Sequence, residues 1–567
     1  MSSRLILLTV ASFLSLAAFA GPAEGDTTKT RRVPRLFQES RFSGEFQTDM
    51  QYCLPASDDD RSEYVKRFLS NSYLDLHYTS RMLDIGTRVE AYENPLPGFE
   101  RDFKGVGVSY LYLSLNLRKV QFTAGDFYEQ FGSGLILRSY YERSLGVDNA
   151  LRGGRITAQP TRWLSLKVLA GKQRYYWSWS DGVVAGADAA LAIDQMAPRL
   201  SEAGHRLQIG GSWVSKWEDL TDILVSPTEK LNLPGAVAAF SSRLGYGYKD
   251  FDLQAEYAYK INDPSADNNY IYRPGQALLL TTSYAVTGFG ITLGAKHTDN
   301  MSFRSDRTAT GRMQQINFLP AISRQQTYAL ANLYPYATQP QGEVAFQGDV
   351  FWKIRKGTLL GGKYGTDLRL NFARIQSPDK DYCDGGTGSQ KATYGYSTHL
   401  FAVGSDLYYQ DVNLDISHRF SPGFKMTFFY MNQTYDQLLI EGHADNGNTV
   451  RANVFVLEGT KRLGRKVSLR VEAQCLLTRQ DKGDWVAGLA EFSVSPHFIF
   501  TLTDLYNTGA AGENYLLGSV TYKTGAHRLQ FSAGQQRAGI TCVGGICRYV
   551  PATKGFMLNY SVNFTTK

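Results

Sequence analysis

Residues 556–565 read FMLNYSVNFT, and this stretch decides the fold class. Along it, aromatic and aliphatic side chains alternate one by one with Met557 and with polar side chains. A period of two is typical of a β-strand that has one apolar face and one polar face. The length matches the roughly 9 to 11 residues that a tilted strand needs to cross a bilayer. The stretch therefore predicts a membrane-spanning strand.

Alternating segments of this kind recur along the chain, and two kinds of spacer take turns between them. The short spacers are residues 523–527, 495–497, 461–466, 421–423, 287–288 and 249–250. The longer, polar spacers are residues 538–554, 507–513, 479–484, 436–448, 375–397, 298–343 and 261–275. A closed barrel in a membrane has short turns on one rim and longer loops on the other, and this alternation predicts such a barrel.

The order of spacers also decides ambiguous segments. Residues 396–420 must form one long, projecting strand, since two strands would place the turn at 421–423 on the wrong rim. Residues 183–193 supply a required extra crossing, followed by a turn with a short helix over 194–205. We therefore predict an all-β, closed antiparallel transmembrane barrel with an inward-folding segment and long extracellular loops. It should have about 24 strands, within a range of about 20 to 26.

The first residues carry the pattern of an export signal. Arg4 precedes an apolar run over residues 5–17, and Ala18-Phe19-Ala20 has the small-x-small form of a cleavage site. We expect cleavage after Ala20, a flexible leader over residues 21–39 and the barrel over residues 40–567. No long apolar run follows Ala20, so the mature chain can cross a membrane only as a closed barrel.

The composition agrees with this reading and indicates the location. The chain has 54 Gly, 35 Tyr and 31 Phe among 567 residues, which suits turns and interfacial aromatic girdles. Its formal net charge of +7 is compatible with anionic headgroups and also with ordinary solubility. We expect an integral protein of a Gram-negative outer membrane that contacts lipid and lipopolysaccharide. Envelope proteins are candidate partners, and no motif for nucleic acid is present.

Residues 125–155 differ from an ordinary strand or turn because they mix aromatic, glycine and oppositely charged residues. Such a segment suits the polar interior of a barrel, where charges can pair. We predict a segment that folds into the lumen and constricts it; the alternative is a long extracellular loop. The candidate lumen residues are Asp126, Glu129, Arg138, Glu142, Arg143, Asp148 and Arg152.

A second unusual segment, residues 314–347, is too apolar and aromatic for a disordered loop. It includes Arg324, Tyr334 and Tyr336, the candidate residues of the barrel mouth. Three interpretations stay open: a lid over the mouth, a ligand-contacting segment that folds in, or plain packing at the rim.

The five cysteines fit export to an oxidising compartment. Cys542 and Cys547 enclose four residues and predict a disulfide that closes an exposed loop tip. Cys53 and Cys383 are a candidate second pair, and Cys475 is expected to be free within a strand.

The sequence does not favour an enzyme. It contains no Gly-x-Ser-x-Gly elbow and no His-Glu-x-x-His pair. His443, beside Glu441 and Asp445, is the best position for a general base, but a histidine among acids in a loop is usually just solvated. The acidic residues at 58–60, 381 and 384 lack a calcium-loop pattern, so we expect no metal and no cofactor.

Four motifs together resemble an uncharacterised family of Bacteroidota outer-membrane proteins, recorded as a domain of unknown function. They are residues 125–132 (GDFYEQFG), 300–304 (NMSFR), 334–339 (YPYATQ) and 542–548 (CVGGICR). The resemblance covers nearly all of the mature chain. It implies a Gram-negative outer-membrane setting and brings no substrate, activity or catalytic residue.

Three functions follow from these features. The leading hypothesis is a wide barrel that acts as a channel or transporter, because a barrel of this width leaves a channel or holds a plug. The second is a non-conducting accessory barrel of a secretion or uptake complex, supported by the long outer loops and the rigid disulfide tip. The third and most remote is a barrel-embedded hydrolase at the outer rim.

Overall fold

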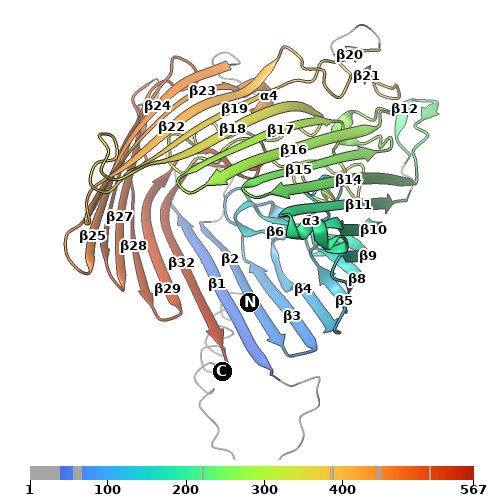
Figure 1. Cartoon of the computed structure of the whole chain (residues 1–567), viewed down its shortest axis with the longest axis horizontal. Coiled ribbons are helices and arrows are strands. Elements are labelled where there is room, and N and C mark those ends of the chain that lie inside the picture. Colours follow the sequence, from blue (N-terminus) through green and yellow to red (C-terminus); the bar gives the residue numbers. More distant parts are fainter. Residues whose placement is uncertain are drawn as a thin grey trace, which may run out of the picture.

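The structure is a computed structural model, and it describes residues 39–54, 67–219, 222–383, 385, 388–442, 449–509 and 512–566. Twenty-four antiparallel strands form one sheet, and β1 pairs with both β2 and β32, so the sheet closes on itself. Figure 1 shows this closure, with β32 in red beside β1 in blue. The predicted fold class and strand number are therefore confirmed.

The strands follow one another round the barrel in chain order. Their bounds are β1 Arg41–Cys53, β2 Phe68–Thr79, β3 Leu83–Tyr92, β4 Gly105–Asn116, β5 Val120–Phe127, β8 Leu151–Thr161, β9 Leu164–Tyr175, β10 Ser178–Ala192, β11 His205–Trp217, β14 Ala236–Tyr248, β15 Phe251–Lys260, β16 Gly275–Val286, β17 Phe289–Asp299, β18 Gly342–Ile354, β19 Thr366–Gln376, β22 Leu407–Ser421, β23 Phe424–Asp436, β24 Thr449–Arg462, β25 Val467–Leu477, β26 Trp485–Val494, β27 Phe498–Asn507, β28 Leu517–Thr524, β29 His527–Gln536 and β32 Thr553–Thr565.

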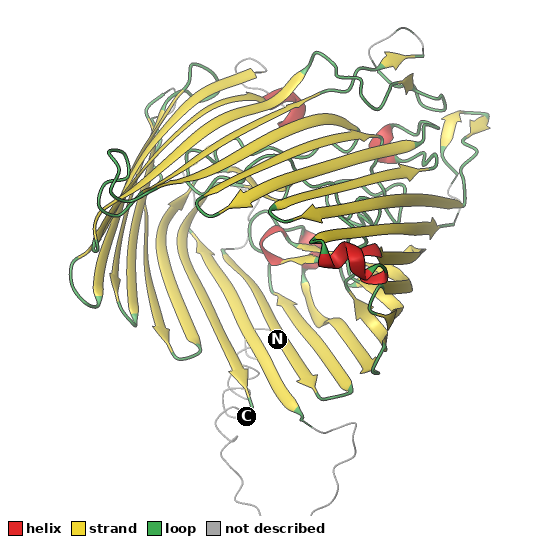
Figure 2. Ribbon diagram, viewed as in Figure 1, coloured by secondary structure: helices red, strands yellow, loops and turns green. Residues whose placement is uncertain are grey.

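Small elements lie in the connections between the barrel strands. They are the two-stranded pairs β6 Tyr141–Glu142 with β7 Val147–Asp148, β12 Leu224–Ser226 with β13 Glu229–Lys230, β20 Asp381–Tyr382 with β21 Tyr396–Ser397, and β30 Gly539–Val543 with β31 Ile546–Val550, and the short helices η2 Arg101–Phe103, α2 Ile193–Met196, α3 Pro198–Glu202, η3 Arg143–Leu145, η4 Ala266–Asn268 and α4 Gln437–Glu441. Figure 2 shows how little of the fold is helical. Among the described residues, no helix is long and apolar enough to cross a membrane.

The two rims differ as the spacers predict. One rim, called the turn rim, carries mostly connections of two to four residues, with longer ones at 193–204 and 355–365. The other, called the loop rim, carries the long connections, with one tight turn at Tyr176–Trp177. The predicted extra crossing is β10, and the predicted short helix after it is the pair α2 and α3.

Two predicted boundaries are wrong. Residues 396–420 make a single crossing as expected, but the barrel strand begins only at Leu407, and residues 396–397 pair with β20 instead. Residues 125–155 are not one inserted segment, because β5 runs to Phe127 and β8 begins at Leu151. The inserted part is therefore residues 128–150.

The outward side chains form an apolar belt. Exposed aliphatic residues such as Val168, Leu293 and Leu502 lie along the middle of the strands. Exposed aromatic side chains lie near both strand ends: Phe42, Tyr284, Phe289, Trp352, Phe420, Phe498 and Tyr522 toward the turn rim, and Tyr52, Phe68, Tyr175, Trp217, Tyr259, Tyr506 and Phe556 toward the loop rim. Two aromatic girdles that flank an apolar band are typical of a barrel embedded in a membrane.

The lumen is filled unevenly along its axis. On β25, the inward side chain of Ser468 near the turn rim is partly exposed, whereas Glu472 is 4% exposed and Leu476 at the loop rim is 0% exposed. The inward residues Arg528 and Ser532 of β29 follow the same order, from exposed to buried. Material therefore fills the half of the lumen near the loop rim and leaves the half near the turn rim accessible to solvent.

Candidate functional site

Three loop-rim connections fill the lumen and make up the candidate site. The first inward segment is residues 128–150, between β5 and β8. The second inward segment is residues 300–341, between β17 and β18. The disulfide hairpin is residues 539–550, formed by β30 and β31.

The first inward segment reaches between two distant parts of the wall. On one side, the guanidinium of Arg143 lies 3.2 Å from Asp75 of β2 and over the ring of Tyr73 at 4.3 Å. On the other side, the backbone N–H of Ser133 donates to Glu256 of β15 at 2.6 Å. Because β2 and β15 lie nine strands apart round the barrel, the segment crosses the lumen.

Asp148 holds the end of this segment. Its carboxylate, only 4% exposed, accepts from Arg174 of β9 at 2.5 Å and from the Tyr128 hydroxyl at 2.9 Å, and it lies 3.6 Å from Arg88 of β3. Glu90 of β3 also pairs with Arg174, at 2.7 Å. Burial, and next the charge of Asp148, raise the pKa of Tyr128 well above its usual range, so Tyr128 stays a neutral donor.

The other predicted residues of the segment have separate roles. Glu129 pairs with two wall residues, Arg155 at 3.2 Å and Lys167 at 2.7 Å. The guanidinium of Arg138 lies over Phe318 of the second inward segment at 4.0 Å from the ring centroid. Glu142 accepts from the Ser144 N–H and hydroxyl, which caps η3 locally.

Asp126 and Arg152 differ from the expected lumen position. They are paired by two bonds of 2.8 Å at opposed positions of β5 and β8, and the next opposed pair, Phe127 and Leu151, belongs to the inner core. Successive residues of a strand point to opposite faces, so Asp126 and Arg152 point outward. Arg152 lies over Trp179 at 3.9 Å and is 43% exposed.

The second inward segment packs along the inside of the opposite wall. Leu330 is fully buried, and its N–H donates to Gln474 of β25 at 3.1 Å. The predicted mouth residues lie on this wall: Arg324 bonds Asn413 at 3.0 Å, and the Tyr334 hydroxyl donates to Asp481 at 2.9 Å. Of the three interpretations, the ligand-contacting segment that folds into the barrel matches this inward placement. The side chains of Arg324, Tyr334 and Tyr336 themselves contact the wall.

Buried charges anchor both ends of the second inward segment. Lys296 at the end of β17 pairs with Glu343 at the start of β18, and both side chains are 0% exposed. Lys296 also donates to the carbonyl of Pro320, and the Tyr336 hydroxyl donates to Glu343. Sequence reasoning missed this pair. A charged residue at an inward strand position directly beside a long loop is the signal that could have found it.

The two inward segments are bonded to each other. The Arg138 N–H donates to Ile316 at 2.8 Å, and the Phe318 N–H donates to Gly134 at 2.9 Å. The side-chain amide of Asn317 donates to the carbonyl of Leu135 at 3.1 Å. They therefore form one body in the lumen, which we call the plug.

The disulfide hairpin folds onto the plug. The predicted disulfide between Cys542 and Cys547 is present, but the exposed tip is wrong, because Cys542 is only 7% exposed. The Thr338 N–H donates to Gly545 at 3.1 Å, and Gln325 donates to the carbonyl of Cys542 at 3.0 Å. A disulfide ring of six residues stiffens the hairpin but does not determine whether the hairpin points into or out of the lumen. The sequence alone therefore could not distinguish an outward tip from an inward one. Cys53, Cys383 and Cys475 are free.

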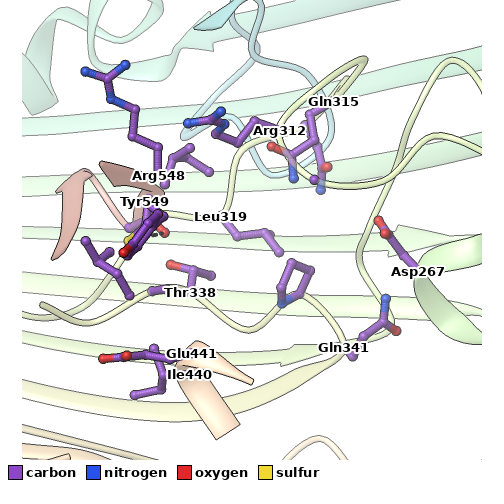
Figure 3. Close-up of a pocket in the computed structure, with 18 of the residues that line it drawn as sticks. Asp267, Arg312, Gln315, Leu319, Thr338, Gln341, Ile440, Glu441, Arg548 and Tyr549 are labelled. Carbon is purple, nitrogen blue, oxygen red and sulfur yellow. Dashed lines mark hydrogen bonds between the residues drawn. The ribbon is translucent and has the colours of Figure 1, made fainter. Parts of the chain in front are cut away.

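A cavity of about 680 Å³ lies where the second inward segment, the hairpin and α4 meet (Figure 3). Its size is within the range of small-molecule sites, about 300 to 1,000 Å³. Three polar atoms of lining residues, Arg312 Nη1, Thr338 Oγ1 and Gln341 Nε2, are buried and have no hydrogen-bond partner within the described parts of the chain. Leu319 and Ile440 add apolar surface. The cavity therefore suits a small solute that has both acceptor oxygens and apolar carbon.

Some expectations lie outside the described residues: cleavage after Ala20, the general base His443, and the acids at 58–60 and 384. Within the described ranges, no group of three or more His, Cys, Asp or Glu side chains could hold a metal ion.

Several solved structures resemble this chain over most of its length. The P pilus usher (PapC) translocation pore has 10% identity and a TM-score of 0.43, over 93% of this chain and 99% of that chain. A mutant ferric enterobactin receptor (PfeA) from Pseudomonas aeruginosa has 9% identity and a TM-score of 0.41, over 93% and 80%. OccAB4 from Acinetobacter baumannii has 9% identity and a TM-score of 0.33, over 93% and 99%. These likenesses concern the fold alone.

Sequence comparisons identify the family and leave its activity open. No curated protein sequence matches the chain. The predicted resemblance to an uncharacterised family is confirmed by a match over residues 1–564, while the Bacteroidota origin stays a prediction. The chain belongs to DUF6029, a family of unknown function.

Proposed function

We propose that this protein is an integral outer-membrane barrel that acts as a channel or transporter, closed near the loop rim by its own plug. The apolar belt between two aromatic girdles supports the membrane placement, with lipid and lipopolysaccharide as its surroundings. Short turns face the periplasm in such barrels, so the turn rim is the periplasmic side.

One observation carries the transport function: the plug is built from loop-rim connections and not from wall strands, and it meets the wall through ion pairs as well as through buried apolar side chains such as Phe131 and Leu330. Ion pairs such as Arg143 with Asp75 and Arg324 with Asp415 link plug to wall at 3.2 and 3.3 Å. In a narrow barrel, the side chains of the wall strands alone fill the lumen. A barrel of 24 strands is too wide to be filled in this way, so its lumen is either an open channel or is closed by a plug. Displacing the plug would open a continuous path.

The cavity beside the hairpin is the proposed place where a solute meets the plug. It is bordered by residues of the plug and of the hairpin, such as Thr338 and Ile546. A solute bound there contacts both, so it can favour one plug position over another, provided that its affinity differs between the two. The alternative of an accessory barrel was supported by the long outer loops and by a rigid disulfide tip, and the inward fold of the hairpin removes the second of these supports.

Conductance in planar bilayers tests this proposal. We expect the unmodified barrel to stay closed, and a variant with residues 129–149 and residues 301–340 each replaced by a short Gly-Ser linker to conduct in discrete steps. A control that lacks the small β12–β13 hairpin, residues 223–231 on the same rim, should stay closed. Folding of each variant is checked by heat-modifiable electrophoretic mobility. A folded plug deletion that does not conduct would refute the channel.

A further inference from the structure

The turn rim carries a strongly basic arc on ten neighbouring strands, β18 to β29. Its charged residues lie within 353–367, 418–425, 461–467 and 522–528. The basic members, all exposed, are Lys353, Arg355, Lys356, Lys363, Arg419, Lys425, Lys461, Arg462, Arg465, Lys466, Lys523 and Arg528. Asp367, 4.0 Å from Lys353, is the one acidic residue in these ranges.

This arc is more basic than the protein as a whole. Twelve basic residues and one acidic residue give it an excess of eleven positive charges, whereas the whole chain has a net charge of +7. The remainder of the chain is therefore net acidic by four charges. The positive charge is thus concentrated on one rim, which a random distribution of solubilising charges would not produce.

Exposed apolar side chains lie among the basic ones. Leu359 is 99% exposed and Leu360 is 70% exposed, between Lys356 and Lys363 in the connection at 355–365. Leu463 is 54% exposed between Arg462 and Arg465. Basic and apolar side chains mixed at one level are typical of a surface in the headgroup region of a bilayer.

The arc borders the aromatic girdle of the turn rim. Trp352, Phe420 and Tyr522 are exposed on the outer face, so their strand neighbours Lys353, Arg419 and Lys523 point into the lumen. The same alternation turns Lys425, Arg462 and Arg528 inward and Lys461 outward. The members that can place their charges among lipid phosphates are therefore Lys461 and the turn residues Arg355, Lys356, Lys363, Arg465 and Lys466, whose long side chains can extend along apolar surface.

We propose that Lys461 and the turn residues of this arc, Arg355, Lys356, Lys363, Arg465 and Lys466, form a binding site for the headgroups of anionic phospholipids in the leaflet at the turn rim. The proposal rests on the membrane placement proposed above. A basic side chain near an anionic surface gains about 1 kcal/mol, which corresponds to about a fivefold change in association. We therefore expect an anionic lipid to be preferred over a zwitterionic lipid by about fivefold at low salt.

Spin-labelled lipids test the site in reconstituted phosphatidylcholine vesicles, through the fraction of lipid whose motion the barrel restricts. Labelled phosphatidylglycerol should exceed labelled phosphatidylcholine in this fraction for the unmodified chain. The preference should fall to near unity in the variant Arg355→Gln/Lys356→Gln/Arg465→Gln/Lys466→Gln. The matched control Lys230→Gln/Arg451→Gln/Arg479→Gln/Lys482→Gln removes the same charge from the loop rim and should keep the preference. All eight side chains are exposed, so neither variant disturbs a core.

Each other outcome has a definite meaning. Equal restriction of both lipids by the unmodified chain overturns the lipid site but leaves the membrane barrel intact. An equal loss in both variants also overturns it, because net charge alone would then suffice. Displacement of labelled phosphatidylglycerol by soluble polyglutamate, with no lipid preference left, would assign the arc to an acidic macromolecule. If no lipid is restricted at all, the membrane placement itself fails.

Discussion

Replacing Asp148 by Asn should weaken the anchor between the plug and the barrel wall. The carboxylate accepts from Arg174 at 2.5 Å and from the Tyr128 hydroxyl at 2.9 Å. An asparagine keeps the shape and can still accept from Tyr128, but it removes the charge that Arg174 and Arg88 face. Both arginines retain another carboxylate, Glu90 and Asp75, so no buried charge becomes isolated.

The carboxylates that Arg174 and Arg88 retain limit the free-energy cost of the Asp148→Asn substitution. A hydrogen bond to a charged group contributes about 1.5 to 3 kcal/mol, less than the roughly 3 to 5 kcal/mol lost when a buried charge is left alone. We take about 2 kcal/mol for Asp148→Asn. If the closed plug loses this amount relative to the displaced plug, the ratio of open to closed barrels rises about 30-fold.

Single-channel recording in planar bilayers measures this ratio directly. The matched control is Asp126→Asn, which removes a carboxylate of the outward pair with Arg152 and leaves the plug untouched. We expect openings to be about 30 times more frequent for Asp148→Asn and unchanged for Asp126→Asn. Equal behaviour of the two variants, with both barrels folded, would refute the anchoring role of Asp148.

Three further predictions concern the hairpin, the buried pair and one lysine. Replacing Cys542 and Cys547 by Ser should destabilise the hairpin by about 2 kcal/mol, as the closed ring is short, and should speed proteolysis within residues 537–552; an unchanged cleavage rate would contradict this. Glu343→Gln leaves Lys296 buried without its charge partner and should lower the free energy of unfolding in urea by about 3 to 5 kcal/mol, whereas the exposed Glu229→Gln should not. Burial lowers the pKa of Lys380, in a loop-rim connection, to about 8, so the folded state binds fewer protons than the unfolded state up to about pH 10. The free energy of unfolding should therefore rise from about pH 8 to about pH 10, and Lys380→Met should remove that rise.

The barrel was predictable because its signals are local and repeated. Alternation of period two marks each strand, and the exchange of short and long spacers fixes the rim on which each connection lies. That parity is what recovered β10 from the alanine-rich stretch at 183–193. β8 was missed because Gly153 and Gly154 interrupt its alternation, and its two arginines suggested a lumen segment instead.

Whether an individual strand side chain points into the lumen or outward was less predictable. Gly125 has a φ of 102°, and a Cβ there would lie 2.3 Å from the carbonyl oxygen of Leu111, so the strand is irregular at this point. The register between β5 and β8 nevertheless stays regular, and Asp126 has the same parity as the outward Phe122. Composition does not reveal this parity, which is why Asp126 and Arg152 were expected in the lumen although they point outward.

Long-range pairs of the plug could not be read from the sequence at all. Arg143 and Asp75, or Tyr334 and Asp481, meet only because two connections fold back through the lumen. Composition predicted that residues 125–155 suit a polar interior, but it could not name their partners. The inward fold of the disulfide hairpin is of the same kind, since its contacts Ala321 and Thr338 are more than 200 residues away.

The most direct test of a lumen closed only near the loop rim is cysteine labelling along β25 in membranes. Single cysteines would replace Ser468, Gln474 and Leu476 on the inward face and Val471 on the outward face, with Cys53, Cys383 and Cys475 changed to Ser and the disulfide kept. We predict rapid reaction with a membrane-impermeant maleimide at Ser468 only, because the plug covers Gln474 and Leu476 and lipid covers Val471. Equal reaction at the three inward positions would contradict a plugged lumen.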